Sequence, residues 1–174
     1  DLIWAARFLE KELKLKPQQI GLAGGSHGGY AVLRTLTMPP QFNGVDSQYP
    51  FGFGLCFSGF ADLEEFLKSS NIPDWLTSLL GPFDKNREKY YERSPLYSFE
   101  NLRSPLFVSH GVNDKRTPLS TMDTFIEKLK KSTVPHEIML NEGFGHGLSG
   151  VKNNLDEMDR IMAFLKRVGV ELLR

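Results

Sequence analysis

Gly24-Gly25-Ser26-His27-Gly28-Gly29-Tyr30 is the stretch that decides the fold, because it places a serine between a predicted strand and a predicted helix. The apolar run before it, residues 19–23, is long enough for a buried strand, and residues 30–36 after it read as a helix. A serine at so sharp a turn takes a strained backbone geometry that exposes its hydroxyl group. Glycines on both sides remove the side chains that would clash in the bend.

The G-x-S-x-G pattern makes Ser26 a candidate nucleophile. The backbone N–H of His27 would then point from the start of a helix toward the place where an oxyanion forms. The alternative is a glycine-rich turn that binds an anion without covalent chemistry. That alternative is weaker, because the Gly-Lys-Ser/Thr ending of a phosphate-binding loop is absent here.

A serine nucleophile needs a base, and the base needs a carboxylate to orient it. In α/β-hydrolases these residues follow in the order Ser, Asp or Glu, His, each on a loop after a strand. Asp114 lies in a polar loop after the apolar run 105–109, and His146 lies between glycines after the predicted strand 136–140. The sequence therefore predicts a triad of Ser26, Asp114 and His146.

Other histidines and acids fit these roles less well. His136 opens a strand, at the end of the sheet opposite Ser26, and the expected role of His110 is to hold the loop that carries Asp114. The side chain of His27 should point away from the serine beside it. Asp62, which follows the predicted strand 53–58, is the one serious rival to Asp114. Two further acids fall on helical faces and are most simply solvated, namely Asp123 and Asp156.

Strands and helices alternate along the chain, which predicts an α/β fold with a parallel sheet flanked by helices. The expected strands are about 19–25, 53–58, 105–110 and 136–141. The expected helices are 1–14, 28–37, 61–80 with a break at Pro73, 118–132 and 151–168. The charged run 84–89 reads as a solvated helix start.

Composition narrows the function classes. The chain has 174 residues with 21 basic and 21 acidic side chains, so it lacks the excess charge of a protein that binds nucleic acid or an anionic membrane. Its single cysteine, Cys56, sits in an apolar run and should be a buried thiol. We expect no metal or other cofactor, no membrane span, and a cytoplasmic location, because no cysteine–histidine cluster, long apolar stretch or signal peptide is present.

The chain resembles the prolyl oligopeptidase family of serine peptidases, including its acylaminoacyl-peptidase and dipeptidyl-peptidase branches. Residues 24–30 are similar to the family pattern G-x-S-x-G-G-[YF], and residues 110–118 to H-G-x-x-D-x-x-V-P, with Thr117 in place of the usual valine. Residues 145–147 match the short G-H loop, and residues 91–96 match the stretch that precedes the aspartate-bearing strand. The resemblance runs from about Asp1 to the end of the chain.

This resemblance implies that residues 1–174 are the C-terminal part of an α/β-hydrolase catalytic domain whose N-terminal strands are missing. In the family those strands carry a second oxyanion donor, and a β-propeller usually precedes them. Without them the strand 19–25 becomes a sheet edge. We expect this edge to pair in a homo-oligomer, to be covered by residues 1–14, or to depend on an upstream segment.

Aromatic and aliphatic residues close to the predicted site have two interpretations. The resemblance places part of residues 59–104 in the wall of the specificity pocket, whereas these side chains could equally pack a helical cap onto the sheet. The candidate pocket residues are Tyr30, Phe60, Leu63, Phe66 and Trp75.

Two function classes follow from the sequence. The first is a serine hydrolase, a peptidase acting on short peptides ahead of an esterase acting on small esters, which works through an acyl-enzyme. The second is a hydrolase-like binding module that keeps the triad but lacks an oxyanion partner. In the first class Ser26 attacks, His146 transfers the proton and Asp114 fixes the imidazole tautomer.

Overall fold

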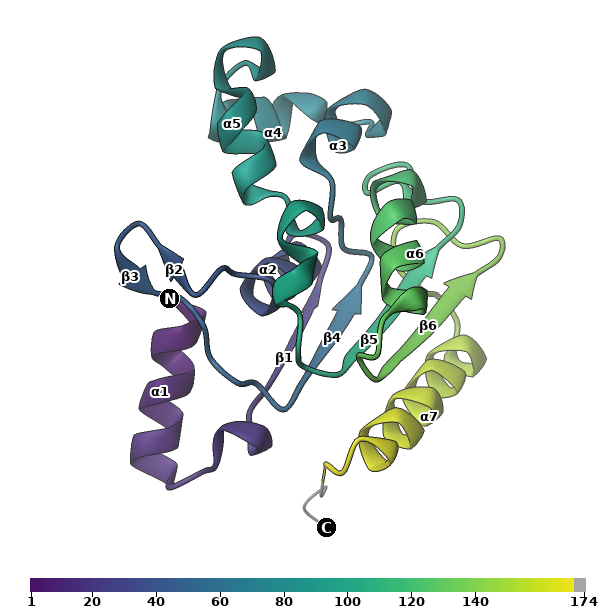
Figure 1. Cartoon of the computed structure of the whole chain (residues 1–174). Helices are drawn as coiled ribbons and strands as arrows, with labels where there is room; N and C mark the ends of the chain where they lie inside the picture. The colour runs from purple at the N-terminus through teal and green to yellow at the C-terminus, as the bar shows by residue number, and fades with distance from the viewer. Residues whose placement is uncertain (171–174) are drawn as a thin grey trace.

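Four parallel strands form the central sheet of the computed structural model, which describes residues 1–170 (Figure 1). Their order in the sheet follows their order in the chain: β1 (Gly21–Gly25), β4 (Phe53–Phe57), β5 (Leu106–Gly111) and β6 (His136–Asn141). All four predicted strands are therefore found, and the parallel arrangement is confirmed. Their carboxyl ends lie at one edge of the sheet, where open α/β sheets place their sites.

Helices cover both faces of this sheet. α2 (His27–Leu36) and α6 (Asp123–Lys131) pack on one face, in a core that includes Cys56 and Val108. α7 (Val151–Arg167) packs on the opposite face, against Leu55 and Phe107. Neighbouring strand residues point to opposite faces, so both sides of β4 and β5 are buried, as the continuous apolar runs predict. Cys56 is a core thiol, as expected, and burial raises its pKa to about 12.

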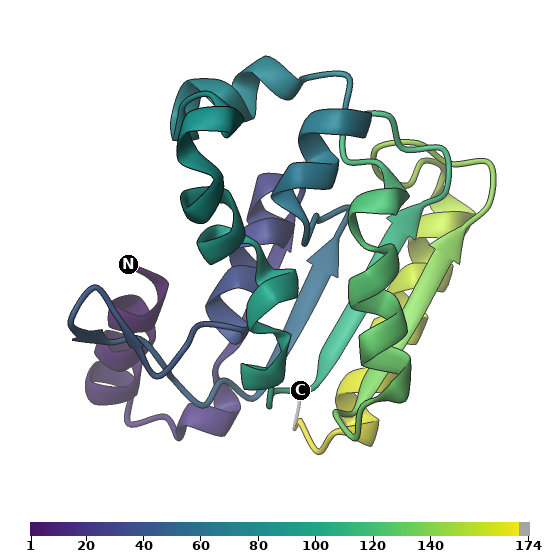
Figure 2. The ribbon, with the colours of Figure 1, turned by 45° about the horizontal axis from the view of Figure 1, so that its top comes forward.

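A helical cap stands over the carboxyl ends of the strands (Figures 1 and 2). It contains α3 (Leu63–Ser69), α4 (Pro73–Leu80) and α5 (Phe83–Arg93). A 3-10 helix, η2 (Pro95–Asn101), leads from the cap back to the sheet. The cap has its own core, formed by the buried side chains of Phe60, Leu63, Phe66, Leu76 and Tyr90.

Two details of the cap differ from the sequence prediction. The helix expected over 61–80 with a break at Pro73 is two helices, and the first ends at Ser69. Ser70 has extended backbone, and the N–H of Asn71 donates to the carbonyl of Lys115 in a distant loop, so tertiary contacts end the helix. Pro73 starts α4, because proline fits the first turn of a helix, where the missing N–H costs nothing. The run 84–89 lies within the first half of α5, which is kinked at Asn86, where φ is −134° and ψ is 26°.

A short hairpin, which is not among the elements predicted from the sequence, joins α2 to β4. β2 (Gln41–Phe42) pairs antiparallel with β3 (Val45–Asp46). The turn between them is Asn43-Gly44, with φ of 52° and 73°. Positive φ at both central residues is the mark of the tight hairpin turn that Asn-Gly favours.

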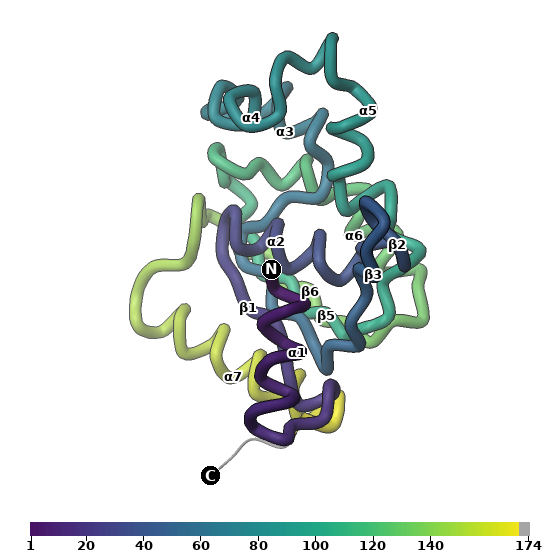
Figure 3. Tube along the Cα trace, turned by 90° about the vertical axis from the view of Figure 1, so that its left-hand side faces the viewer, coloured from purple at the N-terminus to yellow at the C-terminus, as the bar shows by residue number. Residues whose placement is uncertain are grey.

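The amphipathic helix α1 (Leu2–Leu13) forms as predicted and lies beyond the outer edge of β1, in front of this strand in Figure 3 (Figures 1 and 3). Ala23 and Gly25 of β1 nevertheless remain exposed. The helix is held against the hairpin region, where Arg7 pairs with Asp46 at 2.8 Å and the Tyr49 hydroxyl donates to Glu10 at 3.0 Å. Trp4 and Phe8 are 61% and 62% exposed. Among the described strands β1 pairs only with β4, so its outer edge is open.

Two 3-10 turns complete the described elements: η1 (Pro17–Gln19) leads into β1, and η3 (Leu119–Thr121) leads into α6. None of the helices within residues 1–170 is both long and apolar enough to cross a membrane.

Candidate active site

Ser26 sits at a sharp turn between β1 and α2. Its φ of 57° and ψ of −122° are strained for a residue with a side chain, and its N–H donates to the carbonyl of Phe57 at 2.8 Å. Gly24 makes the turn possible, since a Cβ atom there would overlap the backbone carbonyl of Gly28. The sequence thus builds the strained serine turn that the G-x-S-x-G pattern predicts.

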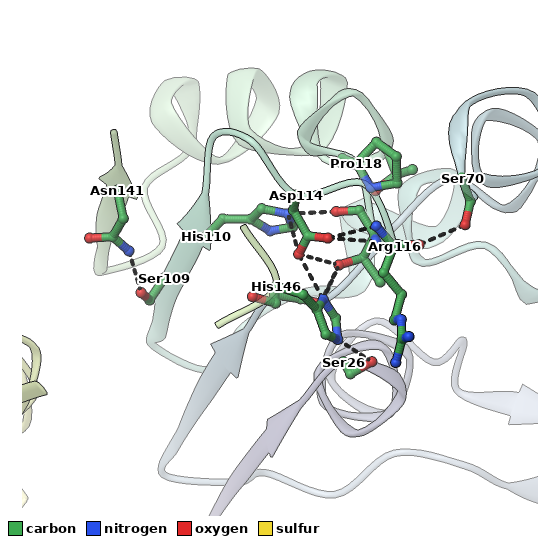
Figure 4. A network of polar contacts seen from close by, with 12 residues as sticks. Ser26, Ser70, Ser109, His110, Asp114, Arg116, Pro118, Asn141 and His146 are labelled. Carbon is green, nitrogen blue, oxygen red and sulfur yellow. Dashed lines mark hydrogen bonds and ion pairs between the residues drawn. The ribbon is translucent and has the colours of Figure 1, made fainter. Parts of the chain in front are cut away.

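His146 links the serine to a carboxylate (Figure 4). Its Nε2 lies 3.0 Å from the Ser26 hydroxyl oxygen, and its Nδ1 lies 2.8 Å from Oδ2 of Asp114. A carboxylate only accepts hydrogen bonds, so Nδ1 carries the proton and Nε2 is free to accept one from the serine. The structure therefore brings Ser26, Asp114 and His146 together, in the geometry of a nucleophile, a base and an orienting acid.

Asp114 is held as a buried carboxylate. Its Oδ1 accepts the N–H groups of Arg116 and Thr117 at 2.8 and 2.9 Å. Its Oδ2 accepts from His146 and lies 2.9 Å from the Thr117 hydroxyl. Burial raises the pKa of Asp114, but these hydrogen bonds together outweigh burial and hold it below its ordinary value. The group is therefore ionised at neutral pH.

His110 supports the loop that carries Asp114, as the sequence predicts. Its Nε2 donates to the Thr117 carbonyl at 2.7 Å, and the ring is almost fully buried. Its Nδ1 has no hydrogen-bond partner among the residues that the structure describes. Burial lowers the pKa of His110 below its ordinary value, against the opposing effects of this hydrogen bond and of Asp114, so the ring is neutral at pH 7.

Neutral burial of His110 predicts a pH-dependent stability. The unfolded chain binds a proton on this ring more readily than the folded chain, so stability should fall as the pH drops below about 6.5. Chemical denaturation of the wild type and of His110→Gln at pH 7.5 and 5.5 tests this. We expect the wild type to lose more stability than the variant between the two pH values. Asp114 titrates at lower pH and does not contribute in this window. Equal losses in both proteins would contradict the prediction.

The loop after Asp114 is fixed by three successive backbone carbonyls. Lys115 accepts the Asn71 N–H at 2.9 Å, and Arg116 accepts the Ser70 hydroxyl at 2.6 Å. The Thr117 carbonyl accepts from His110, which lies on β5. The cap and the sheet thus both fix the loop that orients the Asp114 carboxylate. The local sequence gives no signal for these contacts.

Gly111 lets the loop that bears His146 approach β5. A Cβ atom at this position would overlap the backbone carbonyls of Phe144 and Gly145, next to the histidine. We expect Gly111→Ala to displace the imidazole and lower labelling by a serine-directed fluorophosphonate at least about 100-fold, because small displacements of reacting groups are that costly. Gly145→Ala is the matched control, since its added Cβ meets only a carbonyl at 3.8 Å. Equal labelling of both variants, each folded by circular dichroism, would contradict this explanation.

The rival residues have other roles. Asp62 caps α3, accepting the N–H groups of Glu64 and Glu65 at 3.0 and 3.1 Å. His136 begins β6, at the end of the sheet opposite Ser26, and contacts the Val134 carbonyl. The structure therefore brings neither His136 nor Asp62 into the network of Ser26.

The backbone N–H and the imidazole ring of His27 have different surroundings. His27 is the first residue of α2, so its N–H has no acceptor within the helix. Its exposed ring stacks on Tyr30 at 5.8 Å and meets Trp75 edge-on at 5.1 Å between centroids. This placement agrees with the expectation that the side chain points away from the serine.

The candidate pocket residues divide into two groups. Phe60, Leu63 and Phe66 are only 1–2% exposed and form the cap core, as the packing alternative predicts. Tyr30 and Trp75 are half-buried against that core and carry the ring of His27 between them. Tyr30 is fixed by a hydrogen bond from its hydroxyl to the Arg93 carbonyl at 2.9 Å. Of the five, only Tyr30 and Trp75 present surface that a bound molecule could touch.

Comparison with known proteins identifies the family. The model of the prolyl oligopeptidase family matches residues 1–170. The chain belongs to the prolyl oligopeptidase family. This family member is 28% identical over 163 residues to dipeptidyl aminopeptidase BIII of Pseudoxanthomonas mexicana, covering 88% of the chain and 22% of that protein. It is 23% identical over 175 residues to the acylamino-acid-releasing enzyme of Rattus norvegicus, covering 95% of the chain and 22% of that protein.

Solved structures agree with this family assignment. A puromycin-hydrolyzing peptidase of Mycobacterium tuberculosis matches with a TM-score of 0.85 and 25% identity, over 98% of this chain and 25% of that one. An acylaminoacyl peptidase of Pyrococcus horikoshii matches with a TM-score of 0.77 and 25% identity, over 94% of this chain and 26% of that one. The α/β-hydrolase fold expected from the sequence is confirmed. This member of the prolyl oligopeptidase family spans about a quarter or less of the length of these relatives.

Proposed function

We propose that this chain carries the catalytic triad of a serine peptidase that cleaves short peptides. The observation that carries the proposal is the position of His146, within hydrogen-bond distance of both Ser26 and Asp114. Membership of the prolyl oligopeptidase family supports the same activity.

The contacts suggest the role of each residue. The Ser26 oxygen forms a bond to the substrate carbonyl carbon while its proton passes to Nε2 of His146. The imidazolium then protonates the leaving amine, and the carbon–nitrogen bond breaks to give an acyl-enzyme. Water attacks this ester with His146 again as base, and the proton returns to Ser26. Asp114 remains ionised throughout and holds the proton on Nδ1.

The N–H of His27 would stabilise the oxyanion formed at each tetrahedral step. One such donor is typically worth about 3 kcal/mol of the activation barrier. The strained turn and the start of α2 together fix this N–H beside Ser26.

We propose a peptide as the substrate, because the relatives are named as a dipeptidyl aminopeptidase and an acylamino-acid-releasing enzyme. The half-buried rings of Tyr30 and Trp75, with that of His27, would contact an apolar group of the acyl part. A small ester is the alternative substrate, since the same attack and proton transfers cleave it. Comparing turnover of matched amide and ester substrates separates the two.

A fluorophosphonate probe tests the catalytic proposal, because it reacts with an activated serine and needs no particular substrate. We expect covalent labelling of the wild type at Ser26, located by peptide mass spectrometry, and none of Ser26→Ala. Absence of labelling in a correctly folded wild type would favour the alternative, a hydrolase-like binding module without catalytic activity.

We also propose that the open edge of β1 supports a homo-oligomer. Its N–H and C=O groups on that side lack a partner strand among the described residues, and Ala23 and Gly25 are exposed. Such an edge readily pairs with another chain. Sedimentation equilibrium should show concentration-dependent association that Ala23→Lys weakens. A stable monomer at high concentration would overturn this proposal. The cytoplasmic location stays a prediction from the sequence, for cell fractionation to test.

A further inference from the structure

The Thr117 hydroxyl group lies at the centre of the polar network around Asp114. Its Oγ1 is 2.9 Å from Oδ2 of Asp114 and 3.3 Å from Nδ1 of His146. It is also 2.9 Å from the carbonyl of Ser58, which follows β4. Thr117 is 1% exposed, so water does not compete for these contacts. A hydroxyl has one proton, so it donates a hydrogen bond either to Asp114 or to the Ser58 carbonyl.

The hydrogen bonds of Asp114 favour the carboxylate as the acceptor. A carboxylate offers about four lone-pair positions. Two backbone N–H groups fill the positions on Oδ1, and His146 fills one on Oδ2. The Thr117 hydroxyl is placed at the fourth. The Ser58 carbonyl is at the same distance, 2.9 Å, so either choice leaves one pair of oxygens without a proton between them. The repulsion is greater when the pair left without a proton includes the charged carboxylate oxygen. A charged acceptor also binds a proton donor more strongly than a neutral carbonyl does.

We propose that Thr117 is a positioning residue that holds Oδ2 of Asp114 against His146 and reduces the basicity of the imidazole. This inference rests on the proposed function, since it assigns a role within the same triad. The hydroxyl takes up part of the carboxylate charge that would otherwise stabilise the imidazolium. Loss of the hydroxyl therefore makes His146 easier to protonate, so the serine is activated only at higher pH.

Other charged groups near the pair remain in place when Thr117 is changed. His110 on β5 lies 3.9 Å from Oδ2 of Asp114 and is bonded to the Thr117 backbone, which any substitution retains. Asp123 on α6 interacts electrostatically with His110 and is retained in every variant. The exposed side chains of Lys115 and Arg116 line a pocket of about 480 Å³ beside His146. A change in the titration of His146 can thus be traced to the hydroxyl.

The test compares Thr117→Val, which keeps the shape and removes the hydroxyl, with Thr117→Ser, which keeps the hydroxyl. The readout is the second-order rate of fluorophosphonate labelling as a function of pH. We expect Thr117→Val to move the acid limb upward by about half to one pH unit and to lower the plateau about three- to tenfold. A hydrogen bond to a charged group is worth about one to two pKa units, of which only part distinguishes the two states of His146. Thr117→Ser should resemble the wild type.

A measurement without turnover separates this inference from the proposed function. NMR titration of the His146 ring should give a higher pKa in Thr117→Val than in the wild type, whether or not Ser26 reacts. Thr117→Ala replaces the valine variant if that protein does not fold. Unchanged titration and labelling profiles in the variants without the hydroxyl, or a serine variant that behaves like them, would overturn the role of Thr117. Absence of labelling in the wild type would instead overturn the proposed function.

Discussion

Replacing His146 by alanine is expected to lower turnover about 10⁶-fold, and replacing Ser26 in the same protein should lower it little further. The serine and the histidine of a triad act as one unit, so removing either of them costs about as much as removing the whole triad. The reason here is that Nε2 of His146 is the acceptor for the Ser26 proton, at 3.0 Å. Turnover of a reactive amide by the single and double variants measures this non-additivity.

His136→Ala is the matched control for that experiment. His136 lies at the opposite end of the sheet, and its ring hydrogen-bonds to the Val134 carbonyl two residues before it. It should retain nearly full activity. A double variant far below both single variants, or a His136→Ala variant as impaired as His146→Ala, would show that the base is assigned wrongly.

Replacing Asp114 by asparagine should lower turnover about 10⁴-fold with little change in structure. An amide can donate to Nδ1 of His146, which favours the tautomer that carries its proton on Nε2 and so cannot accept the serine proton. The contact affected is the 2.8 Å hydrogen bond between Oδ2 and Nδ1. Steady-state kinetics, with a thermal melt of each protein, separates this loss from a loss of folding.

The control for the acid is Asp62→Asn. Asp62 caps α3 through two backbone N–H groups, and asparagine caps helices about as well as aspartate does. Activity and stability should therefore change little. If Asp62→Asn lost most of its turnover and Asp114→Asn kept nearly all of it, Asp62 would be the catalytic acid instead of Asp114.

The order of chemistry-bearing residues after strands was the information that made the site predictable. Four apolar runs gave the strands, and parallel strands bring the loops after them to one edge, so Ser26, Asp114 and His146 could be expected to meet. The glycines around Ser26 also made its sharp turn predictable from the local sequence. The hairpin at Asn43-Gly44 also has a clear local signal, because Asn-Gly favours the tight turn between two antiparallel strands, although the hairpin is not among the predicted elements.

Other features depend on contacts between distant segments, which a single sequence does not record. α3 ends at Ser69 because Ser70 and Asn71 bond to the loop at 115–116. Aromatic residues such as Phe60 and Phe66 are typical both of a pocket wall and of a core. Only the packing of the cap shows that these two belong to its core. The proposed role of Thr117 depends on its closeness to His146, which is 29 positions away in the chain.

The 120 positions between Ser26 and His146 have a consequence for how the protein acquires its reactivity. Closing so long a stretch of chain costs entropy before any contact repays it, and such distant pairings form late in folding. The serine turn is held by nearer segments, through the bond from the Ser26 N–H to the Phe57 carbonyl, so it can form before a base lies beside it. Under the proposed mechanism, Ser26 of a partly folded chain should therefore lack the base that activates it. The reactivity of the Ser26 hydroxyl would then report whether the chain has completed its folding.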